Sequence, residues 1–123
     1  MGKRHRQREK LTAPTSDYRD AEGSVLKLRG AMTPATRREY AAVLAGSASN
    51  AFGVGAQRED AWQRAVEFLF ERLAVEWEIA GVATTRQKDL LARFRLASAD
   101  ERRFVRDALR EHLAENFPDL EAP

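Results

Sequence analysis

Few side chains in the sequence could take part in chemistry. The chain of 123 residues contains no cysteine and two histidines, of which His5 lies in a highly charged N-terminal segment. His112 therefore lacks a second histidine, and acid–base catalysis or metal binding needs such partners. The carboxylates of Asp60, Glu67 and Glu71 share one helical face but form no metal-binding motif. The sequence predicts no catalytic residue, no metal and no cofactor, and it favours a packed role for His112 over a pH sensor or a base.

One pair of opposite charges interrupts an apolar segment. Arg72 and Glu76 are four residues apart in a stretch that is expected to be helical, so their side chains would touch. A paired charge among apolar residues favours a structural or interface role. A substrate-binding role for Arg72 is the alternative.

Two tryptophans frame the same segment. Trp62 and Trp77 are four helical turns apart and would lie on nearly one face, with Leu69 between them. Large aromatic side chains dominate both cores and interfaces. We therefore predict that Trp62, Leu69, Arg72, Glu76 and Trp77 are core or interface anchors. The neighbouring charges in the sequence are mostly acidic, which disfavours base stacking with nucleic acid.

Basic side chains concentrate in two places. Residues 1–10 hold five basic residues and one acidic residue, a net charge of +4, which leaves −2 for the rest of a chain whose formal net charge is +2. A second basic group lies on the predicted third helix. Phosphate groups of a polyanion would bind such side chains. The candidate contacts are Lys3, Arg4, Arg6, Arg8 and Lys10 in the arm and Arg86, Lys88, Arg93 and Arg95 in the helix. The alternative for the helix is a solvated face matched to acidic residues of a neighbouring helix.

The element that must position most of these residues is a long apolar helix. From about Arg58 to Ala80, apolar residues cover an arc of about 260° on a helical wheel, which leaves a narrow acidic stripe. Gly81 would end this helix. A helix with so little polar surface is expected at the centre of a bundle or under a second subunit.

A short β-hairpin is expected before the helices. Asp20 suits the start of a turn and Gly23 its left-handed position, between two strands that span Tyr18 to Arg29. Such a hairpin is marginal alone, so it should pack on the helices or pair with another chain. Further helices are expected from Thr33, from Thr84 or Thr85 to about Leu96, and from a Ser98–Glu101 capping box to Pro118.

These patterns together predict a mainly α fold, with about four helices in a small orthogonal or bundle-like domain and a short N-terminal β-hairpin. Residues 1–12 would form a basic disordered tail, residues 13–118 a single helical domain, and residues 119–123 a C-terminal tail. No apolar run is long enough to cross a membrane and no secretion signal is evident, which predicts a cytoplasmic protein without membrane contact.

The predicted function is a small non-enzymatic interaction module. It would self-associate as a homodimer through the apolar central helix, or bind another protein. The reason is that the chain offers too few other predicted elements to cover the apolar helix and to extend the hairpin. The alternative is a nucleic-acid-associated regulatory protein that uses the basic N-terminal arm and the basic third helix.

Overall fold

The computed structural model describes residues 14–45 and 54–123, with side chains in the second range from residue 61 onward. The elements in chain order are β1 (Thr15–Arg19), β2 (Val25–Arg29), α2 (Pro34–Ala45), α3 (Val54–Leu73), β3 (Ala74–Ile79), β4 (Val82–Thr84), α4 (Gln87–Arg95) and α5 (Ala99–Asn116).

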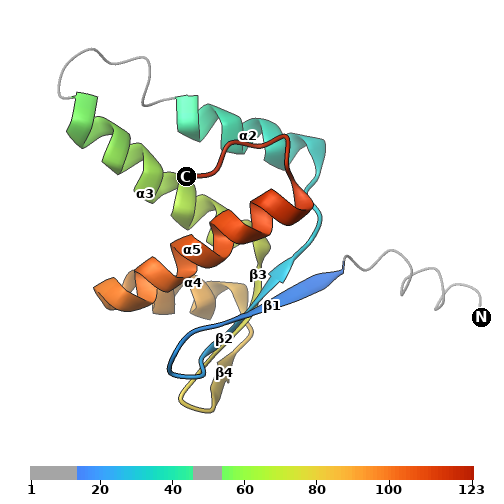
Figure 1. Ribbon diagram of the computed structural model, residues 1–123, viewed down its shortest axis with the longest axis vertical. Coiled ribbons are helices and arrows are strands. Elements are labelled where there is room, and N and C mark those ends of the chain that lie inside the picture. Colours follow the sequence, from blue (N-terminus) through green and yellow to red (C-terminus); the bar gives the residue numbers. More distant parts are fainter. Residues whose placement is uncertain (1–13, 46–53) are drawn as a thin grey trace, which may run out of the picture.

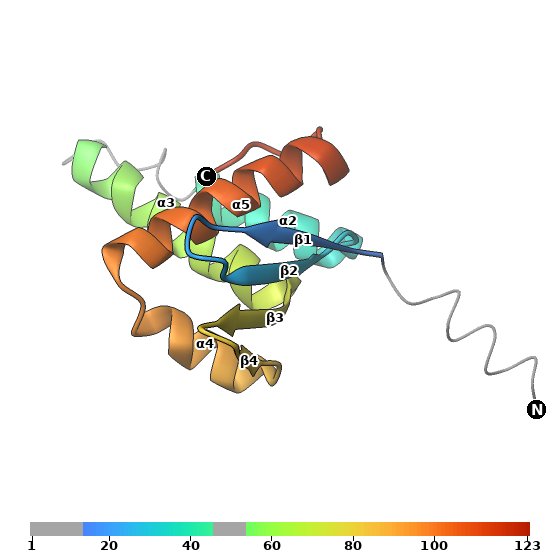
Figure 2. The same cartoon turned by 60° about the horizontal axis from the view of Figure 1, so that its bottom comes forward.

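The fold combines helices with a four-stranded antiparallel sheet, so the prediction of a mainly α fold with a lone hairpin is wrong. The strands follow the order β1-β2-β3-β4, and α2 and α3 are inserted between the second and the third (Figure 1). Helix α5 packs against β2 and α3, α4 packs against β3 and α3, and α2 packs against α3. Figure 2 shows the strands of the sheet side by side, seen from another direction.

The predicted N-terminal hairpin is confirmed. Asp20 accepts hydrogen bonds at its Oδ1 from the backbone N–H groups of Glu22 and Ser24, both at 2.9 Å. Gly23 closes the turn with a φ of 88°, a conformation that glycine adopts without strain. The turn aligns Leu26 and Leu28 on the same face of β2, and both are fully buried.

The predicted long helix is two elements. Helix α3 ends at Leu73 and the chain enters β3 at the next residue. From there Val75, Trp77 and Ile79 alternate with glutamates, a period of two that suits a strand with one buried face. Over so few residues this alternation also fits a helical wheel, which is why the wheel showed an arc too wide for one helix.

Strand β3 completes the hairpin inside the same chain. Trp77 lies opposite Leu26, and Glu76 lies opposite Lys27, in the β2–β3 register. The first pair faces the core, whereas Glu76 and Lys27 form an ion pair at 3.7 Å on the outer face of the sheet. The hairpin therefore needs no second chain to pair with.

Gly81 lies in a turn between two strands and does not end a helix. Ala80 and Gly81 have φ values of 52° and 80° and link β3 to β4, which is the two-residue turn with positive φ at both positions that is favoured in hairpins. The short step from β3 through β4 to α4 also excludes the helix-to-helix connection that the sequence predicted at Gly81.

Replacing Ala80 with asparagine is expected to stabilise the protein by about 0.5–1 kcal/mol, because asparagine tolerates the left-handed conformation that strains alanine. Chemical denaturation measures this change. The same substitution at Ala92, an exposed position in α4, should lower the stability, because asparagine is a poorer helix former than alanine. A loss of stability at both positions would contradict the turn.

Helix α5 begins with the predicted capping box, which is confirmed: the Glu101 N–H donates to Ser98 Oγ at 3.1 Å and the Ser98 N–H donates to Glu101 Oε1 at 2.8 Å. The Ser98 N–H, together with the Arg93 guanidinium, lowers the pKa of Glu101.

The core lies between the sheet and the helices. The fully buried side chains include Leu26, Leu28, Leu69, Phe70, Leu73, Trp77, Leu109 and Leu113.

The last residues of the chain pack against α2. Leu120 and Ala122 contact the core. The buried hydroxyl of Tyr40 donates a hydrogen bond to the backbone carbonyl of Glu121, and burial raises the pKa of Tyr40. The segment after α5 therefore covers one side of α2.

Candidate functional site

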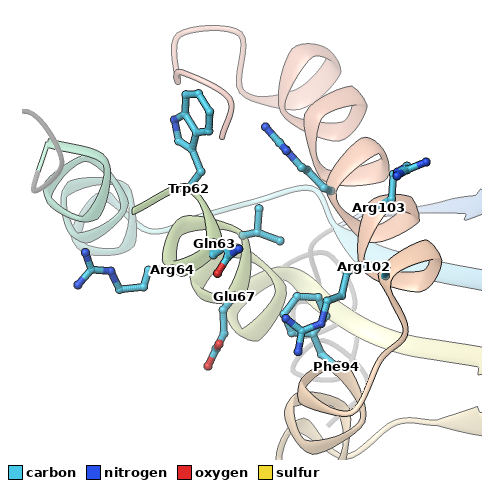
Figure 3. A pocket seen from close by; sticks show the side chains of 10 residues that line it. Trp62, Gln63, Arg64, Glu67, Phe94, Arg102 and Arg103 are labelled. Atoms are coloured by element: carbon cyan, nitrogen blue, oxygen red, sulfur yellow. The ribbon is translucent and has the colours of Figure 1, made fainter. Parts of the chain in front are cut away.

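A groove of about 430 Å³ lies between α3 and α5, with the end of α4 at its base (Figure 3). Its walls combine apolar surface with an excess of positive charge. The apolar lining includes Trp62, Val66 and Phe94, and the charged lining consists of Arg64, Glu67, Arg102, Arg103 and Arg106.

Helix α5 supplies three of the four arginines. Arg102 and Arg106 are one turn apart and therefore share a face of the helix, with Arg103 beside them. Val105 and Leu109 lie on the side of α5 that is fully buried in the core. Because the apolar side of α5 is buried in the core, its basic side faces the groove.

Trp62 is the most prominent side chain of the groove. Its side chain and that of Arg64 leave α3 in different directions (Figure 3). The ring of Trp62 is 40% exposed, and the guanidinium carbon of Arg106 lies 5.6 Å from its centroid. This distance fits a cation–π contact. The Nε of Arg106 is buried and has no hydrogen-bond partner among the described residues.

The lower end of the groove is held by internal contacts. Arg102 stacks 5.5 Å from the ring centroid of Phe94 and donates a hydrogen bond to the Arg95 carbonyl at 2.9 Å. Glu67, the one acidic residue among the described residues of the lining, forms an ion pair with Arg95 at 2.6 Å. The acid in the groove is therefore neutralised by a residue from α4, while the arginines of α5 remain in excess.

The predicted anchor residues lie apart. Leu69 and Trp77 are buried in the core, whereas Trp62 is at the surface and belongs to a different element from Trp77. The predicted pair of Arg72 with Glu76 is wrong because the helix ends between them. Arg72 instead forms an ion pair with Glu39 of α2 at 3.1 Å, and Glu76 forms one with Lys27.

The predicted polyanion contacts on α4 are partly occupied. Arg93 forms an ion pair with Glu101 and Arg95 one with Glu67, which is the matched arrangement given above as the alternative. Arg86 and Lys88 are exposed. The basic arm, Lys3, Arg4, Arg6, Arg8 and Lys10, lies outside the described residues.

Sequence reasoning missed the arginines of α5. Their spacing places them on one side of a helix, and that signal was available in the sequence. What the sequence did not reveal is that α5 crosses α3 beside Trp62, because residues 62 and 106 are brought together only by the tertiary fold. Arg106 therefore lies beside Trp62, although the neighbours of Trp62 in the sequence include acidic residues.

His112 lies outside the groove in a buried hydrogen-bond network. Its Nε2 is 2.8 Å from the Arg29 carbonyl, which only accepts, so Nε2 carries the proton. Its Nδ1 accepts from the Tyr18 hydroxyl at 2.8 Å and from Asn116 Nδ2 at 3.1 Å. Burial, with the nearby charge of Glu115, raises the pKa of Tyr18 to about 12. The network joins α5 to the first two strands.

The described ranges contain neither a metal-binding cluster nor a membrane-spanning helix. Among these residues, no group of three or more histidine, cysteine or acidic side chains could hold a metal ion. Within the same part of the chain, no helix combines the length and the apolar character that a membrane span requires.

The chain matches no protein-family model, no curated protein and no solved structure. The groove between α3 and α5 is the feature from which its function is best inferred.

Proposed function

We propose that the protein is a non-enzymatic protein-interaction module and that its partner binds in the groove between α3 and α5. The observation that carries this proposal is the 40% exposed ring of Trp62 beside Arg106, whose Nε lacks a partner among the described residues. Tryptophan and arginine are the residue types most enriched at the energetic centres of protein interfaces.

The chemistry of the groove favours binding over catalysis. Of the five charged lining residues that the structure describes, four are arginines, which stay protonated and do not exchange protons during turnover. The fifth, Glu67, is held by Arg95. The buried Tyr18 and His112 use their polar atoms to join α5 to the sheet, away from the groove.

A distinct partner fits better than self-association through the central helix. The apolar surplus that suggested a homodimer is absorbed by β3, whose Trp77 is 1% exposed. The β1–β2 hairpin, for which the sequence predicted no further strand, pairs with β3. The outer face of the sheet carries Asp17, Lys27 and Glu76 in neighbouring register positions, and such a charged face is stable in water.

A protein segment also fits the groove better than a nucleic acid. Trp62 is the only large aromatic side chain that is exposed in the described part of the chain, whereas single strands stack their bases on several rings. One face of this ring already contacts Arg106. Arg93 and Arg95 are engaged with glutamates, so the basic surface does not extend along α4.

The experiment is selection of peptides from a randomised library on the immobilised protein, followed by NMR of the labelled protein with the selected peptides. The chain has two tryptophans, so two indole signals report on two sites. We expect the Trp62 signal to shift and the buried Trp77 signal to stay. Trp62→Ala should weaken binding about tenfold or more, as for an interface centre.

The matched control is Leu96→Ala. Leu96 is 82% exposed and does not line the groove, so its removal should leave the affinity unchanged. Spectra of the free protein at two concentrations separate partner binding from self-association. The proposal fails if no peptide is selected, if the selected peptides bind Trp62→Ala equally well, or if the Trp62 signal shifts with protein concentration alone.

A further inference from the structure

We infer that the partner presents an acidic segment, with carboxylates that bind Arg102 and Arg106 next to an apolar side chain on Trp62. This inference rests on the proposed function and specifies the chemistry of the partner.

The first support is the charge balance of the groove. Among the described residues, helix α5 contributes Arg102, Arg103 and Arg106 to the lining, and the charge of Glu67 is already matched by Arg95. Arg103 is exposed and forms no ion pair within the described residues. A cationic groove attracts an anionic partner and repels a cationic one. The excess charge therefore selects the sign of the partner.

The second support is the unused donor on Arg106. Its buried Nε has no partner in the described part of the chain, and burial of an unpaired polar group is unfavourable. A guanidinium binds a carboxylate through two parallel N–H···O bonds. Because Nε is covered by protein atoms in the free chain, a carboxylate in the groove would bind Arg106 in this way once the side chain turns Nε toward it.

The third support is the spacing of the two arginines. Arg102 and Arg106 are separated by four residues of α5, a rise of about 6 Å. Carboxylates at similar spacing occur four residues apart on a helix, or two residues apart on an extended chain. Trp62, which is 40% exposed, lies beside Arg106 and provides apolar surface for a neighbouring side chain of the same segment. An acidic peptide that contains an aliphatic or aromatic residue meets all three requirements.

The test compares peptide pools selected from one unbiased library on three proteins: the wild type, Arg106→Glu and Arg110→Glu. Arg110 is exposed on α5 but does not line the groove, so its reversal changes the net charge by the same amount. We expect the wild-type and Arg110→Glu pools to be enriched in aspartate and glutamate. The Arg106→Glu pool should lose this enrichment.

Affinities give the size of the effect. For the best wild-type peptide, Arg106→Glu should weaken binding about tenfold or more, whereas Arg110→Glu should change it by less than about threefold, because exposed distant charges are screened. Amide versions of the peptide, with asparagine and glutamine in place of the acids, should lose about as much as Arg106→Glu. Arg106→Gln serves as a second variant if thermal melting shows that Arg106→Glu is not folded.

The outcomes separate this inference from the proposed function. Selected peptides that depend on Trp62 but carry no excess of acids would overturn the acidic partner and leave the interaction module intact. An absence of peptides that depend on Trp62 overturns both. A single-stranded DNA oligonucleotide that binds more tightly than any selected peptide, and loses affinity with Arg106→Glu, would also overturn both and assign the groove to nucleic acid.

Discussion

Replacing Trp77 with alanine is expected to lower the free energy of unfolding by about 3–5 kcal/mol. The side chain is 1% exposed, and its ring packs edge-on against Phe70 at 5.6 Å between centroids. Leu26 lies opposite it on β2. Removal of the indole would leave a cavity between the sheet and α3, which neighbouring side chains fill only in part.

The matched comparison is Trp62→Ala, which removes the same side chain from an exposed position. It should cost less than about 1 kcal/mol, because Trp62 is 40% exposed and surface substitutions have small effects. Urea denaturation followed by circular dichroism measures both. If the two tryptophans shared one face of a single helix, their removal would cost similar amounts, and that result would contradict the strand assignment of β3.

Replacing His112 with alanine is expected to lower the free energy of unfolding by about 3–4 kcal/mol, which combines a cavity with the loss of the hydrogen bonds to the imidazole. The fully buried imidazole donates to the Arg29 carbonyl and accepts from the Tyr18 hydroxyl. The Arg29 carbonyl and the Tyr18 hydroxyl would both lose the imidazole as a partner, although Tyr18 also interacts with the side chains of Ser16 and Glu115. Urea denaturation again provides the measurement.

Tyr18→Phe supplies the control for this network. It removes the hydroxyl and leaves the imidazole, which still accepts a hydrogen bond from Asn116, so it should cost about 1 kcal/mol. In the Tyr18→Phe/His112→Ala double variant no hydroxyl is left unpaired. The double variant should therefore be more stable than the sum of the two single effects predicts, and strict additivity would show that the two side chains do not interact.

The parts of the fold that follow from local signals were predictable. The first turn needed only Asp20 and Gly23, and the start of α5 needed only Ser98 and Glu101, because each pair bonds to a backbone that is a few residues away. These signals act before any distant contact forms. They therefore predict the same local structure whether or not the rest of the chain has folded.

The change from α3 to β3 was not predictable in this way. Leu73, the last residue of α3, is followed directly by Ala74, the first residue of β3, and no glycine or proline lies near this junction. The residues on both sides are compatible with a helix. The strand forms because β2, far away in the sequence, offers backbone hydrogen bonds and an apolar face to Trp77. Tertiary context of this kind overrides local preference.

The groove shows the same division between local and distant information. The presence of arginines on one side of α5 could be predicted from their spacing, and the exposure of Trp62 follows from its place on α3. Their meeting depends on how α3 and α5 cross, which in turn depends on β3 taking the place of the last turns of the predicted helix. Because the predicted helix ran through Leu73, the sequence grouped Trp62 with Trp77 rather than with Arg106 of α5.

The pairing of β2 with β3 also sets the order in which the chain can acquire its structure. Each of the two hairpins, β1–β2 and β3–β4, joins strands that are close in sequence, and such units form within microseconds. The central pair of strands closes a loop that contains the whole of α2 and α3, and non-local pairings of this kind slow folding. During synthesis, β2 keeps an unpaired edge until β3 has been translated. The newly made chain is therefore exposed to association with other strands for longer than a helical bundle of the same size would be.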